Sequence, residues 1–342
     1  MLLKSLPDLR DKKVQSKLTL CKKPTPSWNS YFSQYNNVLQ ALINIGFLNK
    51  HTYFREFAMP FLFIFRHTIE LQLKRGLNLN NKDTSIPHNH NLDEEYYKKI
   101  LPKDFYCNLD ALNLKGDGSC FRYVVDKNSQ AYFTKYKVLD IYSLVKYYTS
   151  CNFNSLVMPK VRFSEEEKIK SMFEYPTNLC QNIGVLRTQY DYCLTLLVNS
   201  INENKVNIDD IIIPLYFLLR HGLELGLKCS ISAINKEIPN HYFKKLEKNV
   251  LDSIKTALNN VDKKDKIYKD LICDKENLSK LVDLIESKDK FSEVFRYPVN
   301  RANKFVTLSL SDKSFLKDLA LYRKCDNFLS CALLYLKEEN LI

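Results

Sequence analysis

One motif occurs twice in this chain, and its repetition constrains the fold more than any other feature. The motif reads Arg-His-x-x-Glu-Leu-x-Leu-Lys, and its copies begin at Arg66 and at Arg220. An apolar run that contains one proline precedes each copy, and a second block, Phe-Arg-Tyr, follows each copy, starting at Phe121 and at Phe295. Two ordered blocks that recur together indicate a tandem duplication, so we expect two related units.

The size of the chain fits this organisation. Its 342 residues, 45% of them hydrophobic, are enough for two domains with cores of their own. We expect an irregular N-terminal arm at 1–27, a first helical bundle at 28–157 and a second at 158–342. Only 7 glycines occur, which is few for a fold rich in sheet and tight turns. The sequence therefore predicts an all-α protein of two tandem up-down bundles.

Apolar spacing places the helices within each unit. The longest are expected at 54–77 and at 209–234, where an apolar stretch leads into the repeated motif. Their first halves are apolar nearly all round, which indicates burial on several sides. Pro60 is expected either to start the first of these helices or to kink it. The segments 102–135 and 290–310 are expected to be irregular or extended.

Charge and cysteine usage limit the environment of the protein. The net charge of +12 favours polyanionic partners, although a solvated lysine-rich surface explains it equally well. No pair among the ten cysteines has C-x-x-C spacing, so we predict no metal site and no cofactor. The N-terminus lacks the apolar core of a secretory signal, and no apolar run is long enough to span a membrane. We expect a cytoplasmic protein without a membrane partner.

The repeated motif carries a ladder of charges. Arg66, Glu70 and Lys74 recur at every fourth position, so one helix face allows Glu70 to bridge both cations, and His67 borders that face. The second copy supplies the same four residue types, Arg220, His221, Glu224 and Lys228. Three interpretations remain open. The set is a buried structural network around each glutamate, a basic pocket for a phosphate or a base, or an interface with a partner.

Histidines supply the candidates for chemistry. His67 and His221 are the candidate catalytic residues, because histidine transfers protons near neutral pH. His90 and His241 each follow a predicted central helix and could join the same site if their loops fold back. A role as an ordinary loop or capping residue is the alternative for both.

The Phe-Arg-Tyr blocks also have two interpretations. Arg122 and Arg296 each lie between aromatic residues. In the structural interpretation the aromatic rings pack inward and each arginine pairs with a carboxylate, for which Glu70 and Glu224 are candidates. In the functional one the arginines and rings stack on bases and bind phosphates, as in proteins that bind single-stranded nucleic acid.

The repeated motif, followed by His90-Asn91-Leu92, resembles the HEPN superfamily. The resemblance implies helical bundles that often dimerise, and activities in RNA cleavage, toxin–antitoxin systems and phage defence. Nuclease members carry an arginine and a histidine separated by four to six residues, and no arginine of this chain has that spacing from any of its six histidines. The metal-independent ribonuclease mechanism of the family therefore does not transfer by motif.

These observations lead to two hypotheses about function. The first is an HEPN-like protein that binds RNA or a nucleotide, as an RNA-cleaving toxin or a phage-defence component. Its phosphate contacts would come from Arg66, Lys74, Arg220, Lys228, His90, His241, Arg122 and Arg296. The second is a helical scaffold without catalytic activity that binds a protein partner or a second copy, with its ladders as structural ion-pair networks. The motifs of P-loop, Rossmann, zincin and α/β-hydrolase enzymes are absent.

Overall fold

The computed structural model describes residues 5–49, 52–80, 89–99, 101–102, 104–126, 128–135, 137–151, 155–160, 169, 171–175, 182–233, 242–263, 266–329, 336, 338 and 340 of the chain. This described part is mostly helical, and the sheet within it has two strands. The predicted all-α class is confirmed at this level.

The elements before residue 151 are α1 (Lys12–Lys17), α2 (Trp28–Leu48), η1 (Phe54–Glu56), α3 (Ala58–Asn80), α4 (Glu95–Lys98), α5 (Phe105–Asn108), η2 (Asp110–Leu112), η3 (Ser119–Phe121), β1 (Lys137–Asp140) and α6 (Ile141–Ser150). Those after it are β2 (Met172–Tyr175), α9 (Ile183–Asn202), η4 (Ile208–Asp210), α10 (Ile212–Ala233), α11 (Phe243–Asn260), α12 (Lys266–Lys288) and α13 (Ser314–Asn327).

The two motif-bearing helices begin in the same way. Pro60 and Pro214 each occupy the third position of their helix, α3 and α10, where the missing N–H has no helical partner to lose. A short 3-10 turn precedes each helix, so the expected single helix over 54–77 is interrupted at Phe57. Pro60 therefore starts the helix and does not kink it.

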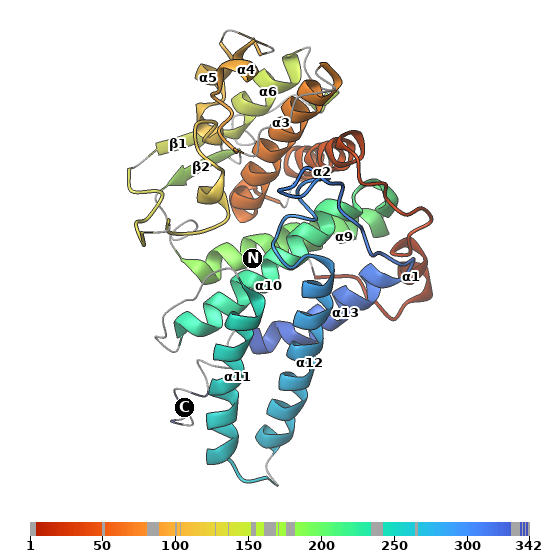
Figure 1. Ribbon diagram of the computed structural model, residues 1–342, viewed down its shortest axis with the longest axis vertical. Helices are drawn as coiled ribbons and strands as arrows, with labels where there is room; N and C mark the ends of the chain where they lie inside the picture. The colour runs from red at the N-terminus through yellow and green to blue at the C-terminus, as the bar shows by residue number, and fades with distance from the viewer. Residues whose placement is uncertain are drawn as a thin grey trace.

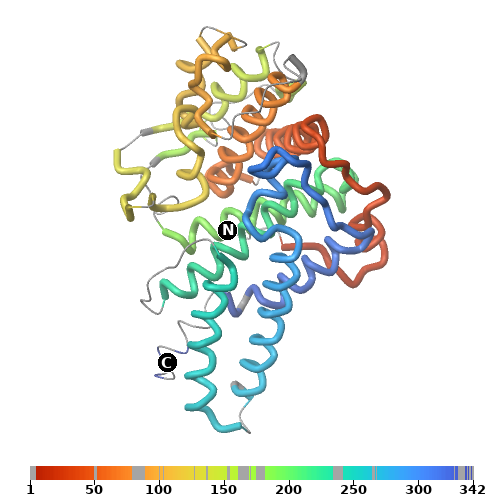
Figure 2. The backbone as a smooth tube through the Cα atoms, in the orientation of Figure 1, coloured from red at the N-terminus to blue at the C-terminus, as the bar shows by residue number. Residues whose placement is uncertain are grey.

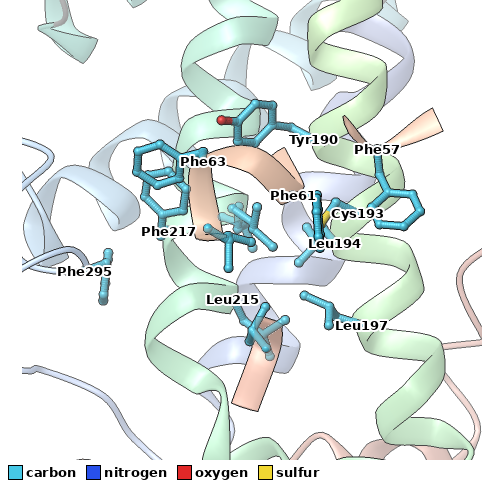
Figure 3. Packing of buried hydrophobic residues seen from close by; sticks show 14 of the residues in the cluster. Phe57, Phe61, Phe63, Tyr190, Cys193, Leu194, Leu197, Leu215, Phe217 and Phe295 are labelled. Atoms are coloured by element: carbon cyan, nitrogen blue, oxygen red, sulfur yellow. The ribbon is translucent and has the colours of Figure 1, made fainter. Parts of the chain in front are cut away.

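Four helices form the centre of the molecule. Helix α2 packs along α3 and α9 packs along α10, while α3 also contacts α9 and α10 contacts α2 (Figure 1). The rings of Phe63 on α3 and Phe217 on α10 stack with their centroids 4.6 Å apart (Figure 3). Side chains from both motif copies consequently belong to one continuous hydrophobic core.

Each central helix is also capped by the other half of the chain. The side-chain oxygen of Gln189 on α9 accepts a hydrogen bond from the Met59 N–H at 3.0 Å. The oxygen of Gln34 on α2 accepts one from the Ile213 N–H at 2.8 Å. These buried glutamines satisfy N–H groups that the first turn of a helix leaves without partners.

Peripheral segments extend from this centre. Helices α11 and α12 form a long hairpin at one end, and the segment with α4, α5 and α6 lies at the other (Figure 1). Strands β1 and β2 pair antiparallel, with Lys137 opposite Tyr175. They lie outside the two segments expected to be irregular or extended. Each of those segments holds one isolated bridge, Val125 with Ala131 and Val299 with Phe305, and the first also contains α5, η2 and η3, which the expectation missed.

The N-terminal arm is more ordered than expected. It contains α1, whose N-terminus is capped by the Asp11 side chain. Val14, Leu18 and Leu20 of the arm are buried, so the arm packs on the body of the protein. The boundary predicted between 157 and 158 remains a prediction.

Candidate functional site

The first charge ladder is centred on Glu70, in the middle of α3. Its carboxylate pairs with Arg66 at 3.0 Å and with Lys74 at 2.9 Å, as the helical spacing predicts. Arg66 also donates to the backbone carbonyls of Asn113, His90 and Gly116. The arginine thus fixes the irregular segment that follows α3.

The second ladder repeats this geometry on α10. Glu224 pairs with Arg220 at 3.1 Å and with Lys228 at 2.9 Å. Arg220 donates to the Asp289 carbonyl at 3.1 Å, and the Asp289 carboxylate lies 3.4 Å from the same nitrogen. Asp289 was not among the predicted site residues, since no repeated motif includes it.

Both ladders are buried. Arg66, Glu70, Arg220 and Glu224 expose 1% or less of their surface. Burial alone would raise the pKa of Glu70, but Lys74, His67 and His90 outweigh it and hold that pKa well below its usual range. The ladders therefore carry charge inside the core, where each ion needs its partner.

The predicted catalytic histidines lie in the same interior. His67 and His221 are each 1% exposed. Burial lowers the pKa of His67 to about 4 and that of His221 to about 3, so both rings are neutral at pH 7. In this geometry neither ring can reach a substrate.

Each of these histidines contacts the block that belongs to the other copy of the motif. His67 Nε2 lies 2.9 Å from the carbonyl oxygen of Arg296, and His221 Nε2 lies 3.0 Å from that of Arg122. Because a carbonyl only accepts, Nε2 carries the proton in both rings. The segments around residues 121 and 295 consequently lie against the helices of the opposite half (Figure 2).

Tyrosine hydroxyls add further contacts to the two Phe-Arg-Tyr blocks. The Tyr35 hydroxyl on α2 donates to the Phe295 carbonyl at 2.8 Å, and the Tyr190 hydroxyl on α9 donates to the Phe121 carbonyl at 3.0 Å. The Tyr297 hydroxyl donates to Glu70 at 2.9 Å. The expected pairing of the block arginines with Glu70 or Glu224 is therefore wrong for the described contacts, because at Glu70 the tyrosine of the block takes that place.

Of the three predicted histidines that the structure describes, His90 is the one that reaches the surface. Its Nδ1 lies 2.8 Å from Glu70 and 2.9 Å from the Tyr297 hydroxyl, and its ring stacks on Tyr297. Its side chain remains 34% exposed. His90 therefore lies at the first ladder, in contact with Glu70.

A cavity of about 470 Å³ lies beside His90. Its charged lining residues are four cations, Lys74, Arg122, Arg296 and Arg301, and two carboxylates, Asp117 and Glu293. His90, Tyr297 and Trp28 also line it. We call it the shared pocket, because Arg122 comes from the first Phe-Arg-Tyr block and Arg296 from the second.

The two block arginines are held differently in the shared pocket. Arg122 is 9% exposed, and its Nη2 donates to the Ser119 hydroxyl at 3.2 Å. Its Nε is buried without a hydrogen-bond partner among the described residues. The Nε of Arg296 donates to the Ser292 carbonyl. Neither guanidinium forms an ion pair with a carboxylate in the described part of the chain.

The structure thus brings together only some of the predicted residues. Lys74, His90, Arg122 and Arg296 line the shared pocket, whereas Arg66, Arg220 and Lys228 are taken up by the buried ladders. His241 lies outside the described residues. The sequence did not predict Trp28, Asp117, Glu293 and Tyr297 as lining residues. Of these four, only Tyr297 belongs to a repeated block, which could have marked it as a candidate.

Two further findings bear on the chemistry of the protein. Among the described residues, no cluster of histidine, cysteine, aspartate and glutamate side chains is placed to hold a metal ion. Within the same residues, no helix has the length and apolar character needed to cross a membrane. Comparisons with protein families, with curated proteins and with solved structures gave no match.

Proposed function

We propose that this protein binds RNA or a nucleotide by holding a phosphate in the shared pocket. The observation that carries the proposal is the convergence of Arg122 and Arg296, one from each repeated block, on the cavity beside His90. Arginine is the residue best suited to phosphate, because its planar fork donates two parallel hydrogen bonds.

We also propose that the two halves are HEPN-like bundles related by internal duplication. Equivalent contacts support this origin: the pairs Gln34–Ile213 and Gln189–Met59 have the same geometry, as do the contacts of His67 and of His221 with the opposite block. In this proposal the two copies pair within one chain as two subunits pair in a dimer. The toxin or phage-defence setting rests on the resemblance alone.

The ladders have a structural role in this proposal. Their burial matches the alternative hypothesis, in which Glu70 and Glu224 anchor ion-pair networks. Removing one partner from such a pair strands the other charge in the core. A structural role for the ladders is compatible with binding in the shared pocket, because Arg122 and Arg296 belong to neither ladder, while His90 and Lys74 join the pocket to Glu70.

Cleavage of bound RNA is the second part of the proposal, and one observation favours it. His90 is partly exposed beside the block arginines, and Glu70 fixes its Nδ1, which leaves Nε2 as the ring nitrogen available for proton transfer. A histidine oriented by a carboxylate is the usual form of a general base. His90 thereby replaces His67 and His221 as the candidate for such a role.

Binding can be tested by fluorescence anisotropy with labelled single-stranded RNA at low salt. The parent protein should bind, and the Arg122→Gln/Arg296→Gln double variant should lose most of the affinity. Arg10→Gln is the control, since Arg10 is exposed and pairs only with the neighbouring Asp8. An unchanged affinity in the double variant would remove the shared pocket from the proposal. An absence of binding by the parent protein would exclude RNA, and a matching absence of nucleotide binding would leave the scaffold hypothesis in its place.

Cleavage is tested in the same preparation. Mixed RNA is incubated with the parent, with His90→Asn and with His67→Ala/His221→Ala. We expect His90→Asn to abolish cleavage while it remains folded. Equal cleavage by the parent and by His90→Asn would exclude His90 from the reaction.

A further inference from the structure

The ion pairs in the shared pocket indicate what kind of ligand it can bind. Two of its cations are already compensated: Lys74 pairs with Glu70 at 2.9 Å, and Arg301 pairs with Glu293 at 2.8 Å. Arg122 and Arg296 have no such carboxylate among the described residues. The pocket therefore presents two guanidiniums without a direct ion pair, and Asp117, which reaches Arg122 only through the Ser119 hydroxyl, offsets part of their charge.

Of the two block arginines, Arg122 is in the less favourable environment for a charge. A guanidinium that is 9% exposed has lost most of its hydration, and such a charge is costly unless an anion compensates it. The ring faces of Phe63 and Tyr123 lie 5.5 Å and 5.1 Å from it, which offers only a partial replacement. Its buried Nε is a donor that finds no acceptor within the described part of the chain. An anionic ligand in the pocket would supply the missing counter-charge.

The other lining residues limit the size of that anion. Asp117 and Glu293 also line the pocket, whereas a channel for a nucleic acid strand is basic along its length. The volume of about 470 Å³ lies within the range of about 300–1,000 Å³ typical of small-molecule sites. These features suit a compact ligand with one strongly charged group.

We propose that the shared pocket binds a terminal phosphomonoester, either of a free nucleotide or of the end of an RNA. A phosphomonoester carries about −1.5 to −2 charge at pH 7, so it can pair with both guanidiniums beside Asp117. An internal phosphodiester has a single negative charge to share between them. This inference rests on the proposed function and names the form of phosphate that the site selects.

The test is isothermal titration of the full chain with matched ligands. The free ligands are adenosine 5′-monophosphate, its methyl phosphodiester and adenosine. The strands are one RNA octamer in three forms, with a 5′-phosphate, with a 3′-phosphate and with hydroxyl groups at both ends. The variants are Arg122→Gln and Arg296→Gln, with Arg10→Gln as the control, and far-ultraviolet circular dichroism checks that each is folded.

We expect the monophosphate to bind about tenfold or more tightly than its methyl ester, because the second negative charge contributes a charge-assisted interaction. Arg296→Gln should remove most of this preference even if Arg122→Gln fails to fold. A phosphorylated octamer that exceeds the hydroxyl octamer by a similar factor identifies an RNA end as the source. A preference confined to the free nucleotide identifies the nucleotide.

Two results would overturn the inference, and they differ in what else they remove. Equal affinity for the monophosphate, the methyl ester and the hydroxyl octamer would refute selection of a phosphomonoester but leave phosphate binding intact. An absence of binding by every phosphate ligand would refute both the inference and the proposed function.

Discussion

Replacement of Glu70 by glutamine gives a direct test of the buried ladder. Glutamine keeps the shape of the side chain but removes its charge. In the folded protein Glu70 compensates Arg66 and Lys74, and it also contacts His90 at 2.8 Å and Tyr297 at 2.9 Å. The substitution therefore leaves two buried cations without a counter-charge.

The size of the effect follows from this burial. Removing one partner of a buried ion pair costs about 3–5 kcal/mol. With an unfolding entropy of about 2.1 cal/mol/K per residue, the 342 residues give about 0.7 kcal/mol per kelvin if the chain unfolds as one unit. Glu70→Gln should consequently lower Tm by roughly 4–7 °C.

The assay is thermal unfolding followed by circular dichroism, with Glu95→Gln as the matched control. Glu95 pairs with Lys98 at 3.1 Å, but its side chain is 83% exposed. An exposed pair of this kind contributes little to stability, so the control should shift Tm by about 1 °C or less. If Glu70→Gln shifts Tm no more than Glu95→Gln does, the ladder is not a buried network.

Two more predictions concern the core. Phe63→Ala and Phe217→Ala should each lower the free energy of unfolding, measured in urea, by about 3–5 kcal/mol. Because the two rings stack at 4.6 Å, the double variant should deviate from the sum of these effects by about 0.5–1.5 kcal/mol. Strict additivity would contradict the contact. Burial lowers the pKa of His67 to about 4 and that of His221 to about 3. Below about pH 6.5 the unfolded chain therefore binds two protons that the folded chain does not. Burial raises the pKa of Asp191 to about 6, so the folded chain binds one proton there that the unfolded chain does not. These three groups alone make the free energy of unfolding fall between pH 6 and 4 by about 1.4 kcal/mol per pH unit, and a larger fall is expected in Asp191→Asn. A flat profile in both proteins would contradict the burial of the histidines.

The sequence predicted those parts of the molecule that local spacing determines. The Arg66–Glu70–Lys74 ladder follows from the helical repeat, and the buried first half of α3 follows from its apolar run. Pro60 marked the start of that helix within a few residues. In each case the interacting groups lie within two or three helical turns of one another.

The shared pocket could not be predicted in this way, because its residues meet only through tertiary contacts. His67 contacts a carbonyl 229 positions away, and Tyr297 reaches Glu70 across 227 positions. Repetition indicated that two similar units exist, but it carried no information on which block packs on which helix. Lining residues outside the repeats, such as Asp117 and Glu293, had no pattern that could mark them.

The most direct test of the shared pocket is a crystal structure of the protein with adenosine 5′-monophosphate. We predict one bound nucleotide whose phosphate oxygens lie within hydrogen-bond distance of both Arg122 and Arg296, beside His90. A phosphate bound outside the shared pocket, or held by only one of the two blocks, would contradict the claim that the repeated blocks build a single phosphate site.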